Sequence, residues 1–417
     1  MISLDAAQEA ILRACAPVGT ELVELRGAVG RVLAHALRAD ADLVPFARSA
    51  MDGFAVRSVD VASGGDLPVR EHVYAGRSQP LVHEAHTATA IATGAPIPRG
   101  ADAVVPIESV VRNNGTIHLA GAVAPGTHIF PPGEDARAGD ELLPAGRRLR
   151  AADLGLLAAS GNARVAVVRR PTAIVVTTGD EVVEPTEMPA HGQIRNSNSV
   201  VVAATLAGWG CDVAQCVHVA DDGEALGDVL ADLLERCDIL VTAGGASVGE
   251  RDLVKPALRR LGCTFTFESV ALRPAKPTAF ATRGSARICV LPGNPSSAFV
   301  ALHEFARPAA LRLAGRADTL LSRVSAELEG GHVRGKAERS YACYAMLRAT
   351  DAGFAVTPLD NQCSALTRTA SSAAGFIVVP PGRREYLPGD RVWVDVVDWS
   401  AVAAISLPRE ASPQRAT

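Results

Sequence analysis

The stretch TAGGASVGERD at residues 242–252 follows a short apolar run, DILV (238–241), and brings two adjacent glycines, Gly244 and Gly245, just after it. A surface turn would explain the glycines. A cradle for an anion explains them equally well, since glycine lets backbone N–H groups face a ligand with no Cβ in the way. The candidate ligand-binding residues of this stretch are Gly244, Gly245, Ser247 and Gly249. The surroundings of the stretch must decide between these two interpretations.

Strand-like and helix-like segments alternate on both sides of this stretch. Apolar runs at 172–178, 211–219, 238–244 and 286–293 are typical of buried strands. Segments with helical spacing and capping residues occupy 197–210, 221–237, 253–262 and 295–315. This alternation predicts an α/β domain with a mostly parallel sheet and helices on both faces.

The remaining segments predict an α/β plus β protein with several domains. Short strand-like runs cut by Gly and Pro indicate a small β domain before the α/β domain and a second β domain after it. The helical segment 151–161 is expected to pack on the first helix, near 4–15. The expected divisions are an N-terminal and linker domain (1–39 and 131–168), a β domain (40–130), the α/β domain (169–317), a C-terminal β domain (318–405) and a flexible tail (406–417).

Composition excludes several classes of protein. The 417 residues are 48% hydrophobic and 21% charged, with a formal net charge of −4, so we expect a globular protein without a general attraction to nucleic acid. No apolar run is long enough to span a membrane, and the N-terminus lacks a secretory pattern, which favours the cytoplasm. The eight cysteines are scattered, and those in apolar runs, such as Cys216 and Cys289, are expected to be buried reduced thiols.

Acids and a second glycine-bearing loop follow the other strands of the predicted sheet. Because the carboxyl ends of parallel strands share one edge, these groups should converge on a ligand. Acids beside bound phosphates favour Mg²⁺, which prefers oxygen ligands. The acids are Glu181, Asp221, Asp222 and Asp252, although Asp222 and Asp252 serve equally well as helix caps. The second loop, PGNPSS at 292–297, contributes Pro292, Gly293, Asn294, Pro295 and Ser296.

Two further charged segments are candidates for the same chemistry. RPAKP at 273–277 carries Arg273 and Lys276, and Lys276 is one of only three lysines beside 38 arginines. A stiff positive rim for an anion and a solvated turn both fit it. The β domain contains the segments 46–56, 92–108 and 131–143, which read either as hairpin turns or as a charged cluster holding Asp52, Thr93, Glu134 and Asp135. GxGxxG and P-loop patterns are absent from the sequence.

Six motifs in order give the chain a resemblance to the molybdopterin molybdenumtransferase family, which includes the terminal domain of gephyrin. They are SAMDGFAV, TGAPIPRGADAVV, PPGED, TTGDE, AGGASVGERD and LPGNPSSA. The resemblance implies an elongated protomer of four parts and a homodimer with its site between protomers. It also implies insertion of molybdenum from molybdate into adenylylated molybdopterin, with Mg²⁺-dependent release of AMP. A molybdopterin adenylyltransferase and molybdoenzymes or their chaperones are the implied partners.

The resemblance also assigns roles to individual residues. The catalytic set is Asp52, Thr93, Asp135, Glu181, Asp221, Asp252 and Lys276, and the metal set is Asp52, Glu181, Asp221 and Asp252. Substrate contacts are implied for the glycine loop, the PGNPSS loop, Arg273 and Ser364.

Departures from the family pattern support one alternative function, and the chemistry of the oxyanion allows a second. Alanine replaces a common glycine at Ala275, Asn196 stands where aspartate is common, Arg48 replaces an asparagine, and GKAERSYACY (335–344) aligns poorly with the family's arginine-containing strand. One alternative is therefore a molybdopterin-binding or scaffold protein that has lost insertion. The other is insertion of tungsten, whose oxyanion is nearly isosteric with molybdate.

Overall fold

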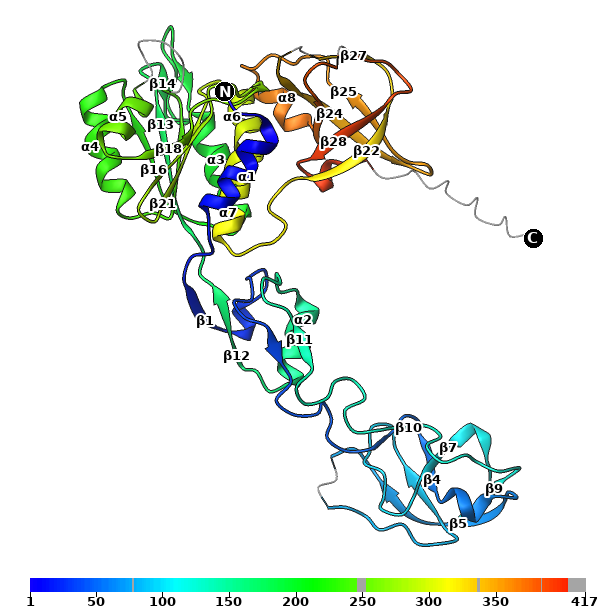
Figure 1. Ribbon diagram of the computed structural model, residues 1–417. Helices are drawn as coiled ribbons and strands as arrows, with labels where there is room; N and C mark the ends of the chain where they lie inside the picture. Colours follow the sequence, from blue (N-terminus) through cyan, green and yellow to red (C-terminus); the bar gives the residue numbers. More distant parts are fainter. Residues whose placement is uncertain (77–78, 246–252, 336–337, 384, 404–417) are drawn as a thin grey trace.

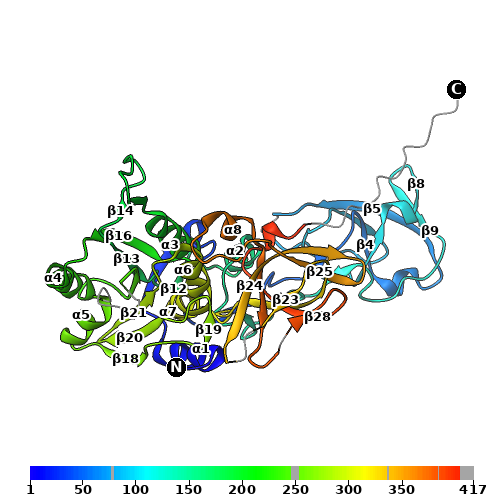
Figure 2. The same cartoon turned by 90° about the horizontal axis from the view of Figure 1, so that it is seen from above.

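The protein is elongated, with folded regions spread along its length (Figure 1). The computed structural model describes residues 1–76, 79–245, 253–335, 338–383 and 385–403. The α/β region and the C-terminal β region lie together at one end, and the small β domain lies at the other, with a linker region between them. Figure 2 shows the same separation of the small β domain from the α/β region. The elongated α/β plus β architecture is thereby confirmed.

A six-stranded sheet forms the centre of the α/β region, in the order β16-β13-β17-β21-β20-β18. The first four strands of this order run parallel, and β20 and β18 add an antiparallel edge. The strands are β13 (Thr172–Thr178), β16 (Asp212–Val219), β17 (Ile239–Ala243), β18 (Thr264–Phe267), β20 (Ala279–Arg283) and β21 (Ala286–Leu291). The predicted mostly parallel sheet is confirmed.

Helices cover both faces of this sheet because its strands are apolar on both sides. Alternate residues of β13 face different cores: Ala173 and Val175 pack with α1, α3 and α7, whereas Ile174 and Val176 pack with α4 and α5. The helices are α1 (Leu4–Ala14), α3 (Ser197–Gly208), α4 (Gly223–Leu234), α5 (Val254–Arg260), α6 (Pro295–Ala301) and α7 (Arg307–Leu313). A π-helical turn, Leu302–Ala306, joins α6 to α7.

The linker region is narrow where it joins the α/β region. Its strands β1 (Thr20–Glu24) and β12 (Arg164–Val168) form a two-stranded antiparallel ribbon. Its helix α2 (Ala151–Ala159) buries Leu157 against Leu33, Leu149 and Val167. The expectation that this segment packs on the first helix is wrong, because α1 instead buries Leu4, Ala7 and Ile11 in the α/β core beside α7.

Two β structures complete the chain. The small β domain is a six-stranded sheet in the order β7-β4-β6-β5-β9-β8, built from β4 (Gly53–Val56), β5 (Gly65–Val73), β6 (Ala88–Ile91), β7 (Ala103–Pro106), β8 (Val111–Asn113) and β9 (Thr116–Leu119). In the C-terminal region, β24 pairs with both β25 and β26, which closes a barrel. The barrel strands are β22 (Ser322–Leu328), β24 (Ser340–Thr350), β25 (Gly353–Pro358), β26 (Gly375–Val379) and β28 (Arg391–Val396).

All eight cysteines are free thiols, as expected. Cys289 is buried, and burial raises its pKa well above the ordinary value. The expectation that Cys216 is buried is wrong, because it lies on the edge strand β16 and its side chain is exposed. Across the described ranges, no helix combines the length and apolar character needed to cross a membrane.

A buried polar cluster joins α1, the π-helical turn and the barrel. Glu304 is 1% exposed, and its Oε2 accepts a 2.8 Å hydrogen bond from Gln8, while its Oε1 has no hydrogen-bond partner among the residues that the structure describes. Arg323 and Asp395 form an ion pair of 2.6 Å beside it. Burial and then the charge of Asp395 raise the pKa of Glu304 to about 8 from its ordinary 4.5.

We predict that Glu304→Gln stabilises the protein increasingly as pH rises. Between pH 4.5 and about 8 the folded protein holds a proton that the unfolded chain has released, so stability falls with pH through this window. Glutamine stays neutral and removes that penalty. Thermal unfolding at about pH 5 and about pH 9 should show the melting temperature of the variant gaining about 2 °C or more at the higher pH.

Glu327→Gln is the control, because that side chain is exposed on β22 and its neutralisation removes no buried charge. A difference between Glu304→Gln and the parent that is the same at both pH values would contradict a buried, protonated Glu304.

Candidate active site

A cavity of about 740 Å³ opens at the carboxyl ends of the parallel strands. Residues following β13, β16, β17 and β21 all line it, as expected for a sheet of this kind. Eight of the candidate residues named from the sequence are brought together there: Glu181, Asp221, Gly244, Gly245, Pro292, Gly293, Asn294 and Pro295.

The end of β17 passes so close to β13 that only glycine fits. A Cβ on Gly244 would lie 2.6 Å from the carbonyl oxygen of Thr178, and a Cβ on Gly245 would lie 3.0 Å from the Thr178 hydroxyl. Both glycines also have positive φ, +109° and +56°. The Thr178 hydroxyl is buried, lines the cavity and has no hydrogen-bond partner in the described structure, so it is available to a ligand.

The second loop is held in place by neighbouring segments. Asn198 donates a 2.7 Å hydrogen bond to the carbonyl of Gly293. The barrel region contributes Ser364, whose carbonyl accepts from the backbone N–H of Ser296 at 3.0 Å and whose hydroxyl accepts from Asn294 at 3.4 Å. Ser296 is fully buried beneath the loop and does not line the cavity, whereas Ala365, beside Ser364, does.

Two acids and one arginine give the cavity its charge. Glu181 is exposed at the rim, and the backbone N–H of Asp221 donates to Asp180 at 3.0 Å. Arg195, on the short strand β15 (Ile194–Arg195), also lines the cavity. The sequence analysis missed Arg195. Its position directly before the capped helix at 197–210, in IRNSNS, was the available signal.

Asp222 is a helix cap, the second of the two roles predicted for it. It caps α4, with its carboxylate accepting from the N–H groups of Glu224 and Ala225 at 2.9 and 3.1 Å. It does not line the cavity. Ser247, Gly249 and Asp252 lie outside the described residues.

Asn196 performs a structural role that depends on its amide. Its Oδ1 caps α3 by accepting from Ser199 at 3.1 Å, and its Nδ2 donates to the Thr177 hydroxyl at 2.8 Å. The side chain is 4% exposed. Asparagine therefore satisfies both an N–H donor and a hydroxyl acceptor in the wall of the cavity, which Asn196 and Thr177 both line.

We predict that Asn196→Ala destabilises the protein by about 1–2 kcal/mol, because it removes a helix cap and one buried hydrogen bond. Asn196→Ser should recover part of the loss, since serine can still cap α3. Urea unfolding followed by circular dichroism measures both effects. Asn113→Ala, at an exposed position on the edge strand β8, is the control. Equal stability of Asn196→Ala and the parent would contradict the role of the cap.

The RPAKP segment lies outside the cavity lining except at its last residue. Arg273 and Lys276 are exposed, and Pro277 lines the cavity. The Arg273–Pro274 peptide bond is cis, and Ala275 has a φ of +99°. The backbone at Ala275 thus keeps a conformation that favours glycine, even though the residue is alanine.

Asp52 and Thr93 form a separate site on the small β domain. The backbone N–H and hydroxyl of Thr93 donate to Asp52 Oδ1 at 2.7 and 2.9 Å. These two bonds, the backbone one first, hold the pKa of Asp52 below its ordinary value. Gly53 is required here because a Cβ would lie 2.0 Å from the carbonyl oxygen of Val105 on β7.

The candidate residues of the small β domain and linker do not reach the large cavity within one chain. Strand β4, which begins directly after Asp52, lies at the opposite end of the protomer from β13 and β17 (Figure 1). Glu134 and Asp135 are exposed in the segment after β10 (Ile129–Phe130) and do not line the cavity. Arg48 packs over Phe130, with its Cζ 5.3 Å from the ring centroid.

Family models match three successive parts of this chain. They are the MoeA N-terminal region (domain I and II) at residues 2–161, a probable molybdopterin binding domain at 174–312, and the MoeA C-terminal region (domain IV) at 333–397. A molybdopterin molybdenumtransferase from Synechococcus elongatus is 39% identical over 321 residues, covering 74% of this chain and 79% of that protein.

The chain belongs to the molybdopterin molybdenumtransferase family. Another relative so named, from Staphylococcus aureus, is 30% identical over 375 residues and covers 89% of both chains. The crystal structure of a molybdopterin biosynthesis MoeA protein from Pyrococcus horikoshii superimposes with a TM-score of 0.82 at 27% identity, covering 95% of this chain and 99% of that one. The resemblance stated from the six motifs is confirmed, and the family is one of enzymes.

Proposed function

We propose that this protein inserts molybdenum from molybdate into adenylylated molybdopterin, with Mg²⁺-dependent release of AMP, to give the molybdenum cofactor. The observation that carries the proposal is the cavity in which two glycine-bearing loops meet Glu181 and Asp221. Glycine amides, a free hydroxyl and Arg195 suit the phosphates of such a substrate. The two acids at the same opening suit its divalent cation.

The residues of this chain would act by binding and positioning. The backbone around Gly244 and Gly245 and the Thr178 hydroxyl would hold the phosphate linkage of the substrate. The exposed cations Arg273 and Lys276 would attract molybdate, a dianion, toward the edge marked by Pro277. Cleavage of a phosphate linkage by positioning and charge neutralisation needs no nucleophilic side chain.

The acids at the cavity fit magnesium. Mg²⁺ in proteins keeps several waters and binds through one or two carboxylates together with substrate phosphates. Glu181 and Asp221 could supply these carboxylates, and the described residues contain no cluster of three or more ligands that would form a closed metal cage. The ion would neutralise charge on the phosphate linkage as it breaks.

A homodimer would bring together the candidate residues that lie far apart in one chain. Asp52 and Thr93 lie at the far end of the protomer from the cavity (Figure 1). A second copy in the opposite orientation would place its small β domain beside the first copy's cavity. In a two-fold dimer such a contact occurs twice, which gives two equivalent composite sites.

We predict that Glu181→Gln and Asp221→Asn each reduce cofactor assembly by at least about tenfold, because each removes a charged ligand for the divalent cation. The assay supplies adenylylated molybdopterin, molybdate and Mg²⁺ and measures AMP release and active cofactor. Asp212→Asn, an exposed acid at the start of β16, is the control.

The parent protein separates the alternatives in the same assay. Substrate bound without AMP release or cofactor would overturn the catalytic proposal and support a binding or scaffold role. Competition between tungstate and molybdate would identify a tungsten-inserting protein.

Mixed dimers test whether the site is shared. A chain carrying Asp52→Ala and a chain carrying Glu181→Gln should each be impaired alone. After mixing and subunit exchange, half of the dimers are hybrids and each hybrid has one site without a substitution, so about a quarter of the parent activity should return. No recovery, with exchange confirmed by mass-tagged chains, would contradict a site built from two protomers.

A further inference from the structure

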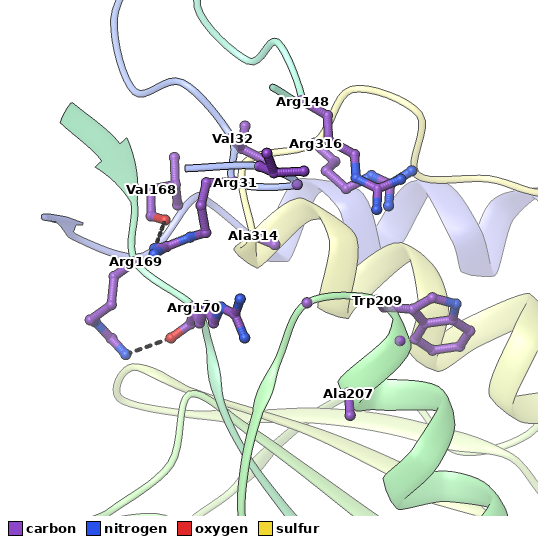
Figure 3. Close-up of a pocket in the computed structure, with 14 residues that line it drawn as sticks. Arg31, Val32, Arg148, Val168, Arg169, Arg170, Ala207, Trp209, Ala314 and Arg316 are labelled. Carbon is purple, nitrogen blue, oxygen red and sulfur yellow. Dashed lines mark hydrogen bonds between the residues drawn. The ribbon is translucent and has the colours of Figure 1, made fainter. Parts of the chain in front are cut away.

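A second cavity, of about 200 Å³, lies where the linker region meets the α/β region (Figure 3). Five arginines line it, and none of its lining residues is acidic. They come from three parts of the fold: the linker region, the segment between β12 and β13, and the end of α7. The five are Arg31, Arg148, Arg169, Arg170 and Arg316, and Trp209 at the end of α3 completes the wall.

Three of these arginines are neutralised by acids that lie outside the cavity lining. Arg31 pairs with Glu21 at 2.5 Å and also donates to the carbonyl of Val168 at 3.0 Å. The second pair joins Arg169 to Asp238 at 2.9 Å. In the third, Arg316 donates through Nε to Asp318 at 2.8 Å.

The other two arginines carry charge that nothing nearby compensates. The guanidinium groups of Arg148 and Arg170 make no ion pair or hydrogen bond to any residue that the structure describes, and both residues are exposed. Figure 3 shows Arg148 beside Arg316, whereas Arg170 comes from the segment that also carries Arg169. The cavity therefore has an excess of positive charge.

The ends of the neighbouring helices do not account for this charge. Arginines near a helix C-terminus can neutralise its free carbonyls. Here backbone N–H groups already bond carbonyls of the last turns: Trp209 bonds Thr205 and Leu206, and Gly315 bonds Arg312. Arg148 and Arg170 contribute no hydrogen bond to either helix, so a structural role leaves them unexplained.

We propose that this cavity binds a small phosphate anion of the pyrophosphate class, either free or as the terminal phosphates of a larger molecule. One guanidinium group can donate two parallel hydrogen bonds to a phosphate. Several guanidinium groups in one cavity favour an anion with more than one negative charge. The cavity is smaller than the 300–1,000 Å³ typical of sites that enclose a whole drug-sized molecule, which favours the phosphates alone.

Binding here would connect regions that are otherwise joined by a narrow ribbon. An anion held by Arg148, Arg170 and Arg316 would touch the linker region, the connecting segment and the α/β region together. The site would therefore restrain the linker region against the α/β region. It lies apart from the large cavity, with which it shares no lining residue.

Calorimetric titration of the full-length protein with inorganic pyrophosphate tests the proposal. We expect one site per chain whose dissociation constant rises about tenfold or more in the Arg148→Ala/Arg170→Ala double variant. Binding should also weaken as NaCl rises from about 50 to about 500 mM. Arg70→Ala, on β5 of the small β domain, removes an exposed arginine whose side chain likewise makes no ion pair or hydrogen bond to a described residue, and it should leave binding unchanged.

Further arms of the experiment make each outcome decisive. Arg148→Lys and Arg170→Lys should give intermediate affinities, because lysine keeps the charge but loses the paired donors. Parallel titrations with AMP and inorganic phosphate distinguish a nucleotide phosphate from a free anion. Undetectable binding of all three anions by the parent protein, or pyrophosphate binding that survives in a folded double variant, would overturn the proposal. The titration measures anion binding by the protein alone. Its result therefore does not depend on whether the protein assembles the cofactor.

Discussion

The close approach of β17 to β13 is the constraint on which the large cavity depends. The carbonyl of Thr178 lies so near Gly244 that any side chain there would force the two strand ends apart. With the strand ends in contact, Gly244 and Gly245 line the cavity together with residues that follow β13, β16 and β21. One packing requirement thus keeps the glycine backbone at the cavity next to the Thr178 hydroxyl.

Much of this arrangement could be predicted from the sequence, because it follows from strand periodicity and from glycine. Four apolar runs predicted the parallel sheet. Because Glu181, Asp221 and the PGNPSS loop follow the carboxyl ends of its strands, their position at the cavity could be predicted as well. Contacts between distant segments could not be predicted in the same way. Arg195 is placed at the cavity by the short pairing of β14 (Val182–Val183) with β15, and Leu4 and Ile11 face the α/β core although the chain then leaves that region. The first feature has only a weak local signal, the position of Arg195 before a capped helix, and the second has none.

The separation of Asp52 from Glu181 has a similar cause. Motif order along the chain carries no information on distance, and the linker region that places them at opposite ends is built from short strands and one short helix. The π-helical turn at Glu304 was equally hidden, since the sequence there has ordinary helical spacing. The chemical groups could be identified from the sequence, whereas their positions in one chain are decided by tertiary packing.

The two-stranded ribbon of β1 and β12 has a mechanical consequence. The chain between residues 25 and 163 is joined to the α/β region through this ribbon. A rotation at the ribbon therefore moves the distant small β domain, which carries Asp52. A small change of angle at the ribbon displaces the small β domain by more than the distance range of a hydrogen bond. The position of Asp52 relative to the α/β region is therefore set by the stiffness of a few residues close to Arg169, far from Asp52 itself.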